Sequence, residues 1–362
     1  GAEETVYQQI DPAITSKFVG YDRLTHDSKI SVLTTEDEVV SALTDGQTGT
    51  IIVDETPFYG TMGGQQGDIG TIEEGDNVFE VKDTIHLQGG RIGHVGKVVS
   101  GMFKVSDVVT LKVDSMNRLS TGKNHSATHL LQKALRNVVG SHVEQKGSYV
   151  DAKRLRFDFS HFSAMTEEEI AKVEKIVNEE IAKDLKVVTE EMTIDEAKKT
   201  GAMALFGEKY GDVVRVVEVG DFSRELCGGC HVQNTAEIGL VKITSESSVG
   251  ANLRRIEAVT SYGALEYVNH IEAELKDAAV TMKTKMFEVA TRSKQLTEQI
   301  KEINQKRKAN KAAAASGELP EALDTFIVDA GYPVFIYRHD GIDASGMRNF
   351  WDIVKSRLDA PG

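Results

Sequence analysis

The first third of the chain alternates apolar and polar residues over short stretches, and it contains no long helical pattern. Alternation with a period of two is typical of β-strands that bury one face. Turns rich in Gly, Asp and Asn separate the stretches. The pattern predicts a β-rich module that ends near Asp114, with strands at residues 29–33, 49–54, 77–85, 95–100 and 108–113.

Helical and strand patterns are mixed between residues 120 and 262, which predicts an α+β region. Seven apolar residues recur at helical spacing from Asn124 to Val139, and Gly140 follows as a stop. A capping box at residues 166–169 predicts the start of a second amphipathic helix. The remaining predicted elements are a short helix over 194–200 and strands at 155–160, 213–219, 240–244 and 255–260.

Beyond residue 262, apolar residues follow alternating steps of three and four from Val268 to Ile303. This spacing predicts one long helix whose heptad seam requires a partner, either in the same chain or in a second copy. An alanine-rich stretch follows, and then two strands at 325–328 and 334–337 and a helix over 347–358. Two strands and one helix are few for an independent domain, so we expect a truncated one.

Charge and composition limit the kinds of partner. The chain has 362 residues and a net charge of −14, which argues against indiscriminate binding to nucleic acid but is compatible with a local basic groove. Its length allows two or three domains. It has no apolar run long enough to span a bilayer and no secretory signal, so we expect a soluble, cytoplasmic protein with no membrane partner.

Two short runs carry the candidate chemistry. His125 and His129 lie one helical turn apart on the face opposite the apolar stripe, and such a pair alone is often a chance occurrence. Both cysteines of the chain, Cys227 and Cys230, fall in a second run that ends at His231. Two cysteines cannot build a disulfide framework, and beside a histidine they favour a metal or redox site. Two imidazoles, a thiolate and a third imidazole form a ligand set typical of zinc.

A dense glycine cluster lies at residues 58–68. Composition alone favours a simple loop. The functional alternative is a place where backbone must approach a ligand closely.

Five runs carry a family resemblance: residues 125–129 (His-Ser-Ala-Thr-His), 143–147 (Val-Glu-Gln-Lys-Gly), 154–159, 201–210 and 225–231 (Glu-Leu-Cys-Gly-Gly-Cys-His). In this order they resemble the editing region of bacterial alanyl-tRNA synthetases, and the resemblance covers nearly the whole chain. It implies four parts: a β-barrel-like subdomain over 1–114, a zinc-dependent editing domain over 115–262, a helical coiled-coil arm over 263–318, and the truncated start of a C-terminal tRNA-binding and dimerisation domain over 319–362. The family's class II aminoacylation core, with its ATP site, would lie upstream, so we expect no charging of tRNA.

The resemblance also implies an aminoacyl-tRNA deacylase that hydrolyses the ester of mischarged tRNA(Ala) and releases serine or glycine. It implies one Zn²⁺ with four ligands: His125, His129, Cys227 and His231. Gln145 matches a polar residue near the family's site and can orient water or substrate by hydrogen bonds. The residues leave open whether zinc activates the water or positions the aminoacyl group. The implied partners are the acceptor end of tRNA(Ala) and a second copy, bound through the C-terminal region.

Three departures from the family matter. Cys230 stands where the family usually has Thr, so Cys-x-x-Cys competes with Cys-x-x-x-His, and we favour Cys227 and His231 as ligands. The run Gly-Thr-Met-Gly-Gly-Gln at residues 60–65 is closer to the free-standing editing proteins related to the family, which carry a threonine there. We therefore hypothesise that the Thr61 hydroxyl recognises the hydroxyl of serine. The C-terminal domain also ends early, which weakens its expected tRNA and dimer contacts.

Because the protein is acidic, contacts with tRNA phosphates must be local. Basic residues near the five runs are the candidates, and a solvated charge or ion pair is an equally good interpretation of each. They are Lys123, Lys146, Lys153, Arg154, Arg156, Lys209, Arg224, Arg254 and Arg255.

Two other functions stay open. A purely structural zinc would make this a tRNA-binding module without hydrolysis. A metal hydrolase for a different ester or amide is the other, although the sequence lacks the His-Glu-x-x-His motif of metalloproteases and the complete His-x-Glu and Pro-Cys-x-x-Cys signature of zinc deaminases. The editing domain of threonyl-tRNA synthetase shares the histidine and cysteine arrangement, but the flanking runs match the alanyl family better.

Overall fold

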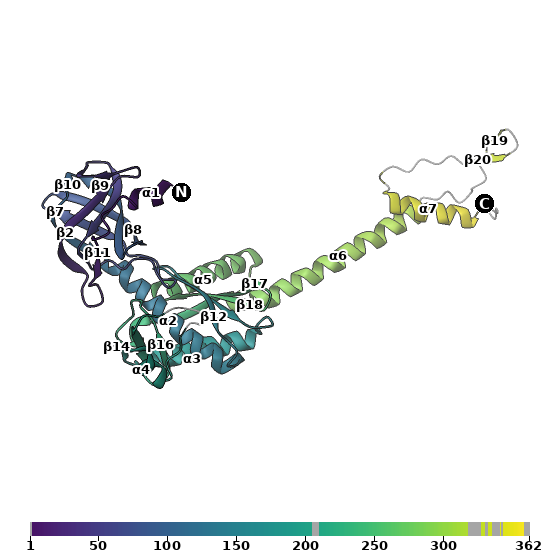
Figure 1. Ribbon diagram of the computed structural model, residues 1–362. Coiled ribbons are helices and arrows are strands. Elements are labelled where there is room, and N and C mark those ends of the chain that lie inside the picture. The colour runs from purple at the N-terminus through teal and green to yellow at the C-terminus, as the bar shows by residue number, and fades with distance from the viewer. Residues whose placement is uncertain are drawn as a thin grey trace. The chain divides into compact units, whose positions relative to one another are not determined.

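The computed structural model describes residues 2–204, 210–317, 327–329, 332–334, 341 and 343–357 (Figure 1). These residues belong to two compact units, Gly1–Asn269 and His270–Gly362. Helices and strands occur together, so the predicted mixed α and β class is confirmed. In the described part of the chain, no helix is long and apolar enough to cross a membrane.

Six strands close into a β-barrel in the first unit, in the order β11-β7-β8-β9-β5-β2, with β11 also paired to β2. Their bounds are Thr25–Thr34 (β2), Thr48–Val53 (β5), Gly70–Glu74 (β7), Asn77–Leu87 (β8), Arg91–Ser100 (β9) and Val108–Val113 (β11). All five predicted strands lie in this barrel. The sequence did not predict β7, because Ile72 is its only fully buried side chain and the alternation is too short to see.

Shorter elements surround the barrel. They are α1 (Ala2–Tyr7), β1 (Lys17–Phe18), β3 (Val39–Val40), β4 (Ala42–Thr44), β6 (Glu55–Thr56) and β10 (Met102–Lys104). The barrel is filled by apolar side chains that include Phe58, Phe79 and Phe103, all fully buried.

One histidine is buried among these apolar side chains. His94 Nδ1 lies 2.7 Å from the carbonyl oxygen of Ile51, and its Nε2 lies 2.7 Å from Thr56 Oγ1. The ring meets the edge of Phe58 at 5.0 Å between centroids. Burial lowers the pKa of His94 to about 4, so the ring is neutral in the folded protein at pH 7.

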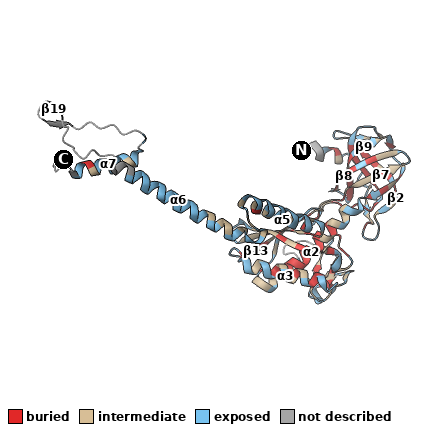
Figure 2. Ribbon diagram, turned by 180° about the vertical axis from the view of Figure 1, so that it is seen from behind, coloured by how far each residue is buried: buried red, intermediate tan, exposed pale blue. Residues whose placement is uncertain are grey.

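The second half of this unit packs two helices against a four-stranded sheet in the order β12-β13-β18-β17. The helices are α2 (Ser115–Val139) and α3 (Glu167–Ala182), and the strands are β12 (Gln145–Val150), β13 (Leu155–Ser160), β17 (Val241–Gly250) and β18 (Leu253–Thr260). The buried residues concentrate between these helices and the sheet (Figure 2). Thr166 forms the predicted capping box with Glu169.

A separate three-stranded sheet lies beside them in the order β14-β15-β16. It consists of β14 (Val187–Thr193), β15 (Val213–Val219) and β16 (Ser223–Leu226), and α4 (Ile194–Lys199) contacts it. A 3₁₀ turn, η1 (Thr235–Ile238), follows the candidate metal-binding run. The predicted short helix over 194–200 corresponds to α4, which ends one residue earlier and has Thr200 as its C-cap.

The histidine helix is longer than predicted. It begins at Ser115 rather than Asn124, and the Asp114 side chain caps it by accepting a hydrogen bond from the Asn117 backbone N–H. The added turns bury no apolar side chain, because Met116 and Leu119 are exposed. Arg118 instead joins this part of the helix to the barrel, since it donates hydrogen bonds to backbone and carboxylate oxygens there.

The prediction of one continuous helix beyond residue 262 is wrong. The structure has α5 (Tyr262–Met282), a 3₁₀ turn η2 (Met286–Glu288) and α6 (Val289–Gly317). Lys283 adopts a positive φ of 53° and ends α5. A lysine carries no sequence signal for this left-handed conformation, so the apolar spacing runs through the break. Dimerisation through the seam stays a prediction.

The last described elements are β19 (Ile327–Asp329), β20 (Tyr332–Val334) and α7 (Ala344–Arg357). The two strands pair antiparallel. They overlap the two predicted strands, and α7 overlaps the predicted helix. Of those predictions, residues 325–326, 335–337 and 358 lie outside the described residues.

We predict that His94 makes the protein less stable in acid. Its folded pKa of about 4 is lower than its unfolded value of 6.5, so its contribution is complete above pH 6.5 and is lost as pH falls toward 4. The variant His94→Gln keeps an amide donor and acceptor but cannot titrate. Between pH 7 and 4.5, urea unfolding should show that the wild type loses about 2–3 kcal/mol more than the variant. An equal loss in both proteins would refute this assignment.

Candidate metal centre

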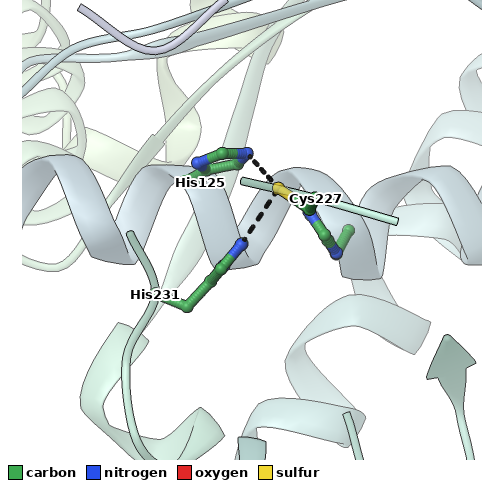
Figure 3. Close-up of side chains that lie close together, drawn as sticks. His125, Cys227 and His231 are labelled. Atoms are coloured by element: carbon green, nitrogen blue, oxygen red, sulfur yellow. Dashed lines mark hydrogen bonds between the residues drawn. The ribbon is translucent and has the colours of Figure 1, made fainter. Parts of the chain in front are cut away.

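Four potential ligands from two distant segments meet in the first unit. His125 and His129 lie one turn apart on α2, and Cys227 and His231 lie on the loop that follows β16. One donor atom from each residue lies within 4.8 Å of the donor atoms of the others. Cys227 Sγ is 3.4 Å from His125 Nε2 and 3.3 Å from His231 Nε2 (Figure 3).

These separations suit a small tetrahedral cation. Zinc bonds of about 2.0–2.1 Å to nitrogen and about 2.3 Å to sulfur place neighbouring ligands roughly 3.5 Å apart. Three imidazoles and one thiolate are also donors that zinc prefers. The donor set and its spacing therefore fit Zn²⁺, with His125, His129, Cys227 and His231 as the residues that would hold it.

A glycine lets the cysteine loop approach the helix. A Cβ atom on Gly229 would lie 2.0 Å from Cε1 of His125, which is far inside van der Waals contact. A side chain at this position would push the loop away from α2. Gly229 is thus needed for Cys227 and His231 to reach the two helical histidines.

Two of the imidazoles have a polar neighbour at the nitrogen that faces away from the common point. His125 Nδ1 lies 2.8 Å from Gln65 Oε1, and His231 Nδ1 lies 3.0 Å from Ser126 Oγ. Such contacts fix the rotation of a ligand ring and leave Nε2 free for a metal. Both rings are thereby held with Nε2 toward Cys227.

The third imidazole faces a carboxylate. His129 Nδ1 lies 3.2 Å from Glu225 Oε2, at ion-pair distance but without the alignment of a good hydrogen bond. Burial raises the pKa of Glu225 to about 8, so this carboxyl group is mostly protonated at pH 7. In its ionised form, a carboxylate behind a histidine ligand raises the basicity of the ring.

His125 and His129 are buried and Cys227 and His231 are half-buried, and desolvation shifts each titratable member toward its neutral form. It lowers the pKa of His125 to about 4 and also lowers the pKa of His129 and of His231. It raises the pKa of the Cys227 thiol to about 12. An ionised Cys227 would need a positive charge beside it, and a divalent cation would supply that charge.

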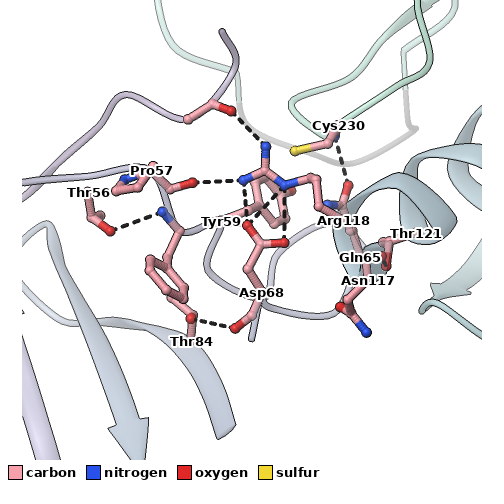
Figure 4. A network of polar contacts seen from close by, with 12 residues as sticks. Thr56, Pro57, Tyr59, Gln65, Asp68, Thr84, Asn117, Arg118, Thr121 and Cys230 are labelled. Atoms are coloured by element: carbon pink, nitrogen blue, oxygen red, sulfur yellow. Dashed lines mark hydrogen bonds and ion pairs between the residues drawn. The ribbon is translucent and has the colours of Figure 1, made fainter. Parts of the chain in front are cut away.

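Cys230 lies next to this group but is not one of the four. Its backbone N–H donates a 2.8 Å hydrogen bond to Gln65 Oε1, and its side chain lies beside the Arg118 guanidinium (Figure 4). The geometry therefore favours the Cys-x-x-x-His arrangement of Cys227 and His231.

A pocket of about 360 Å³ opens onto the donor group. Gln145 from β12 lines it together with His125, His129 and Cys227. Thr61 is not among its lining residues, although its neighbour Met62 is. The Thr61 hydroxyl instead accepts a 2.7 Å hydrogen bond from the Gly67 N–H, which leaves its own proton free to donate.

Most of the predicted RNA-binding residues have partners within the protein. Four pair with carboxylates: Lys146 with Glu144, Arg224 with Glu218, Arg254 with Glu246, and Arg255 with Asp158. Arg156 lies over the Tyr149 ring at 5.4 Å. Lys209 lies outside the described residues. Each paired side chain would have to exchange a carboxylate for a phosphate to bind RNA.

The sequence did not single out several residues around the site. Gln65 and Ser126 hold two ligand rings, and Glu225 stands behind the third. Arg215 lines the pocket, stacks over Tyr21 at 3.8 Å and donates a 2.6 Å hydrogen bond to the Gly229 carbonyl. The only signal was indirect: Gln65 lies in the glycine cluster, Ser126 lies between the two helical histidines, and Glu225 begins the cysteine run.

Comparison with known proteins agrees with the geometry. Residues 2–117 match the family described as tRNA synthetases class II (A). Residues 214–257, which include the cysteine run, match the threonyl and alanyl tRNA synthetase second additional domain.

Full-length relatives match nearly the whole chain. Alanine–tRNA ligase 1 of Lachnoclostridium phytofermentans is 55% identical over 358 residues, which is 99% of this chain and 41% of that protein. The alanine–tRNA ligase of Bacillus pumilus is 46% identical over 96% of this chain and 40% of its own length, and that of Burkholderia cenocepacia is 44% identical over 94% and 39%. The chain thus spans about 40% of the length of these relatives, and it belongs to the alanyl-tRNA synthetase family.

Proposed function

We propose that this chain carries the editing activity of an alanyl-tRNA synthetase: hydrolysis of the ester in seryl- or glycyl-tRNA(Ala), with release of the wrong amino acid. The observation that supports it most is the pocket that opens onto three of the four potential zinc ligands. The match of residues 214–257 to the second additional domain of threonyl and alanyl tRNA synthetases supports the same assignment.

The size of the pocket suits an aminoacyl ester. A volume of about 360 Å³ lies at the low end of small-molecule sites. It accommodates a small amino acid with part of its ribose. The rest of the tRNA would lie outside, where the acidic surface requires local basic contacts.

The protein's own residues would bind and orient the ester. Zn²⁺, when bound, supplies a Lewis acid that polarises a carbonyl or lowers the pKa of water. Gln145 presents an amide at the pocket wall, which can donate to the ester carbonyl and accept from a water. Arg215 adds a fixed positive charge to the same wall.

A second function stays in contention for a specific reason. Four protein donors converge, and four ligands complete a tetrahedral structural zinc site with no open position. The chain would then be a zinc-stabilised tRNA-binding module without hydrolysis. Binding of tRNA with no release of serine would favour this alternative.

We predict that hydrolysis of seryl-tRNA(Ala) depends on Cys227 and not on Cys230. Cys227→Ala removes the only sulfur of the donor group and should abolish serine release, whereas Cys230→Ala should retain most of it. Release of radiolabelled serine by zinc-loaded proteins measures both, and alanyl-tRNA(Ala) serves as the substrate that should stay intact. Equal loss in both variants would contradict the ligand assignment, and no release by the wild type despite bound tRNA would contradict the function.

We predict that Thr61 contributes to the preference for serine. If its hydroxyl donates to the hydroxyl of serine, Thr61→Val should slow seryl ester hydrolysis about tenfold more than glycyl ester hydrolysis, the loss expected for one hydrogen bond. Thr61→Ser keeps the hydroxyl and is the matched control. The hypothesis fails if both esters slow equally in Thr61→Val.

A further inference from the structure

Gln65 is fully buried, and its side-chain oxygen lies between the barrel loop and the metal-binding residues. We propose that Gln65 is a positioning residue for the metal centre: its Oε1 holds His125 in the tautomer that carries the proton on Nδ1, so that the Nε2 lone pair faces Cys227. This inference rests on the metal-binding part of the proposed function.

The orientation of the Gln65 amide is fixed by a backbone group. The Cys230 N–H can only donate, and it points at the Gln65 side chain at 2.8 Å (Figure 4). The atom that receives this hydrogen bond must therefore be the amide oxygen, because an NH₂ group in its place would meet a second donor.

The tautomer of His125 follows from that orientation. The same Oε1 lies 2.8 Å from His125 Nδ1, and an amide oxygen only accepts. Nδ1 must carry the proton, so in the neutral ring Nε2 carries none. That nitrogen lies 3.4 Å from Cys227 Sγ, on the side where the four donors meet.

The neighbouring histidine lacks such a constraint. His231 Nδ1 faces the Ser126 hydroxyl, which already accepts a 3.1 Å hydrogen bond from the Val232 N–H but can still donate. Either tautomer of His231 satisfies this contact. Of these two rings, only His125 has its tautomer fixed by a backbone donor, through the Gln65 amide.

The glycine cluster brings Gln65 to this place. A Cβ on Gly64 would lie 2.3 Å from the Ser148 carbonyl oxygen, and its φ is +86°. Without that side chain the loop joins β12, since Val150 N–H donates to the Gly64 carbonyl at 2.8 Å and Gln66 N–H donates to the Val150 carbonyl at 2.9 Å. The barrel loop thus reaches across to the domain that holds the zinc ligands.

The amide nitrogen of Gln65 gives a further reason to assign the function of this side chain to its oxygen. Gln65 Nε2 is buried and has no hydrogen-bond partner among the described residues. A buried donor without a partner is destabilising, and an apolar side chain of the same shape would avoid this cost. A glutamine is favoured here only if its acceptor is needed.

Nitrogen NMR of metal-free protein labelled with ¹⁵N-histidine tests the tautomer directly. The His125 signals are those missing from His125→Gln. We expect the wild type to show a protonated Nδ1 and a bare Nε2, and we expect Gln65→Leu to populate the opposite tautomer. A wild-type His125 with its proton on Nε2 would overturn the proposal, even if zinc binding and ester hydrolysis were intact.

Zinc affinity provides the second readout. Gln65→Leu should bind Zn²⁺ about 10–100-fold more weakly in competition with a chelator, the usual loss when the partner of a ligand is removed. Gln65→Glu keeps an acceptor and should restore most of the affinity, and Gln66→Leu, the same change one residue along the loop, should leave it unchanged. Equal affinity in Gln65→Leu and the wild type would also overturn the proposal. A wild type that binds zinc with the expected tautomer but does not hydrolyse the ester would contradict only the proposed function.

Discussion

The ion pair between Arg118 and Asp68 joins the two halves of the first unit, and the geometry of the candidate metal centre depends on it. Asp68 is buried and the Arg118 side chain is mostly buried, and Arg118 also donates 2.7 Å hydrogen bonds to the Gly20 and Pro57 carbonyls of the barrel (Figure 4). Removing one partner of such a pair leaves a buried charge and costs about 3–5 kcal/mol. Arg118 lies on the same helix as the histidine pair, so it sets where that helix stands against the barrel.

This junction explains why the barrel takes part in the metal centre. Asp68 pairs with Arg118, and the Gln65 side chain contacts the His125 ring. These two residues lie three positions apart in one glycine loop. Tyr21, from another barrel segment, donates a 2.6 Å hydrogen bond to the Gly228 carbonyl of the cysteine loop. The barrel therefore holds both the helix and the loop that carry the ligands, and a change in one half is expected to reach the other.

The sequence predicted the parts of this site that local chemistry determines. His125 and His129 are one turn apart, and both cysteines fall in one run, so the donor types could be named without a structure. The partners of these residues could not be predicted, because Gln65 lies sixty positions from His125 and its contact depends on how the loop folds back. The start of α2 and the break at Lys283 were missed for a related reason, since apolar spacing reports neither the hydrogen bonds of Arg118 to the barrel nor a left-handed lysine.

We infer that three imidazoles and the Cys227 thiolate hold one metal ion, with Cys230 beside it. X-ray absorption at the zinc edge of protein loaded with one equivalent of Zn²⁺ tests this most directly. We expect one sulfur at about 2.3 Å and nitrogen ligands at about 2.0 Å, with the sulfur signal lost in Cys227→Ala and kept in Cys230→Ala. Two sulfurs around the zinc, or none, would contradict it.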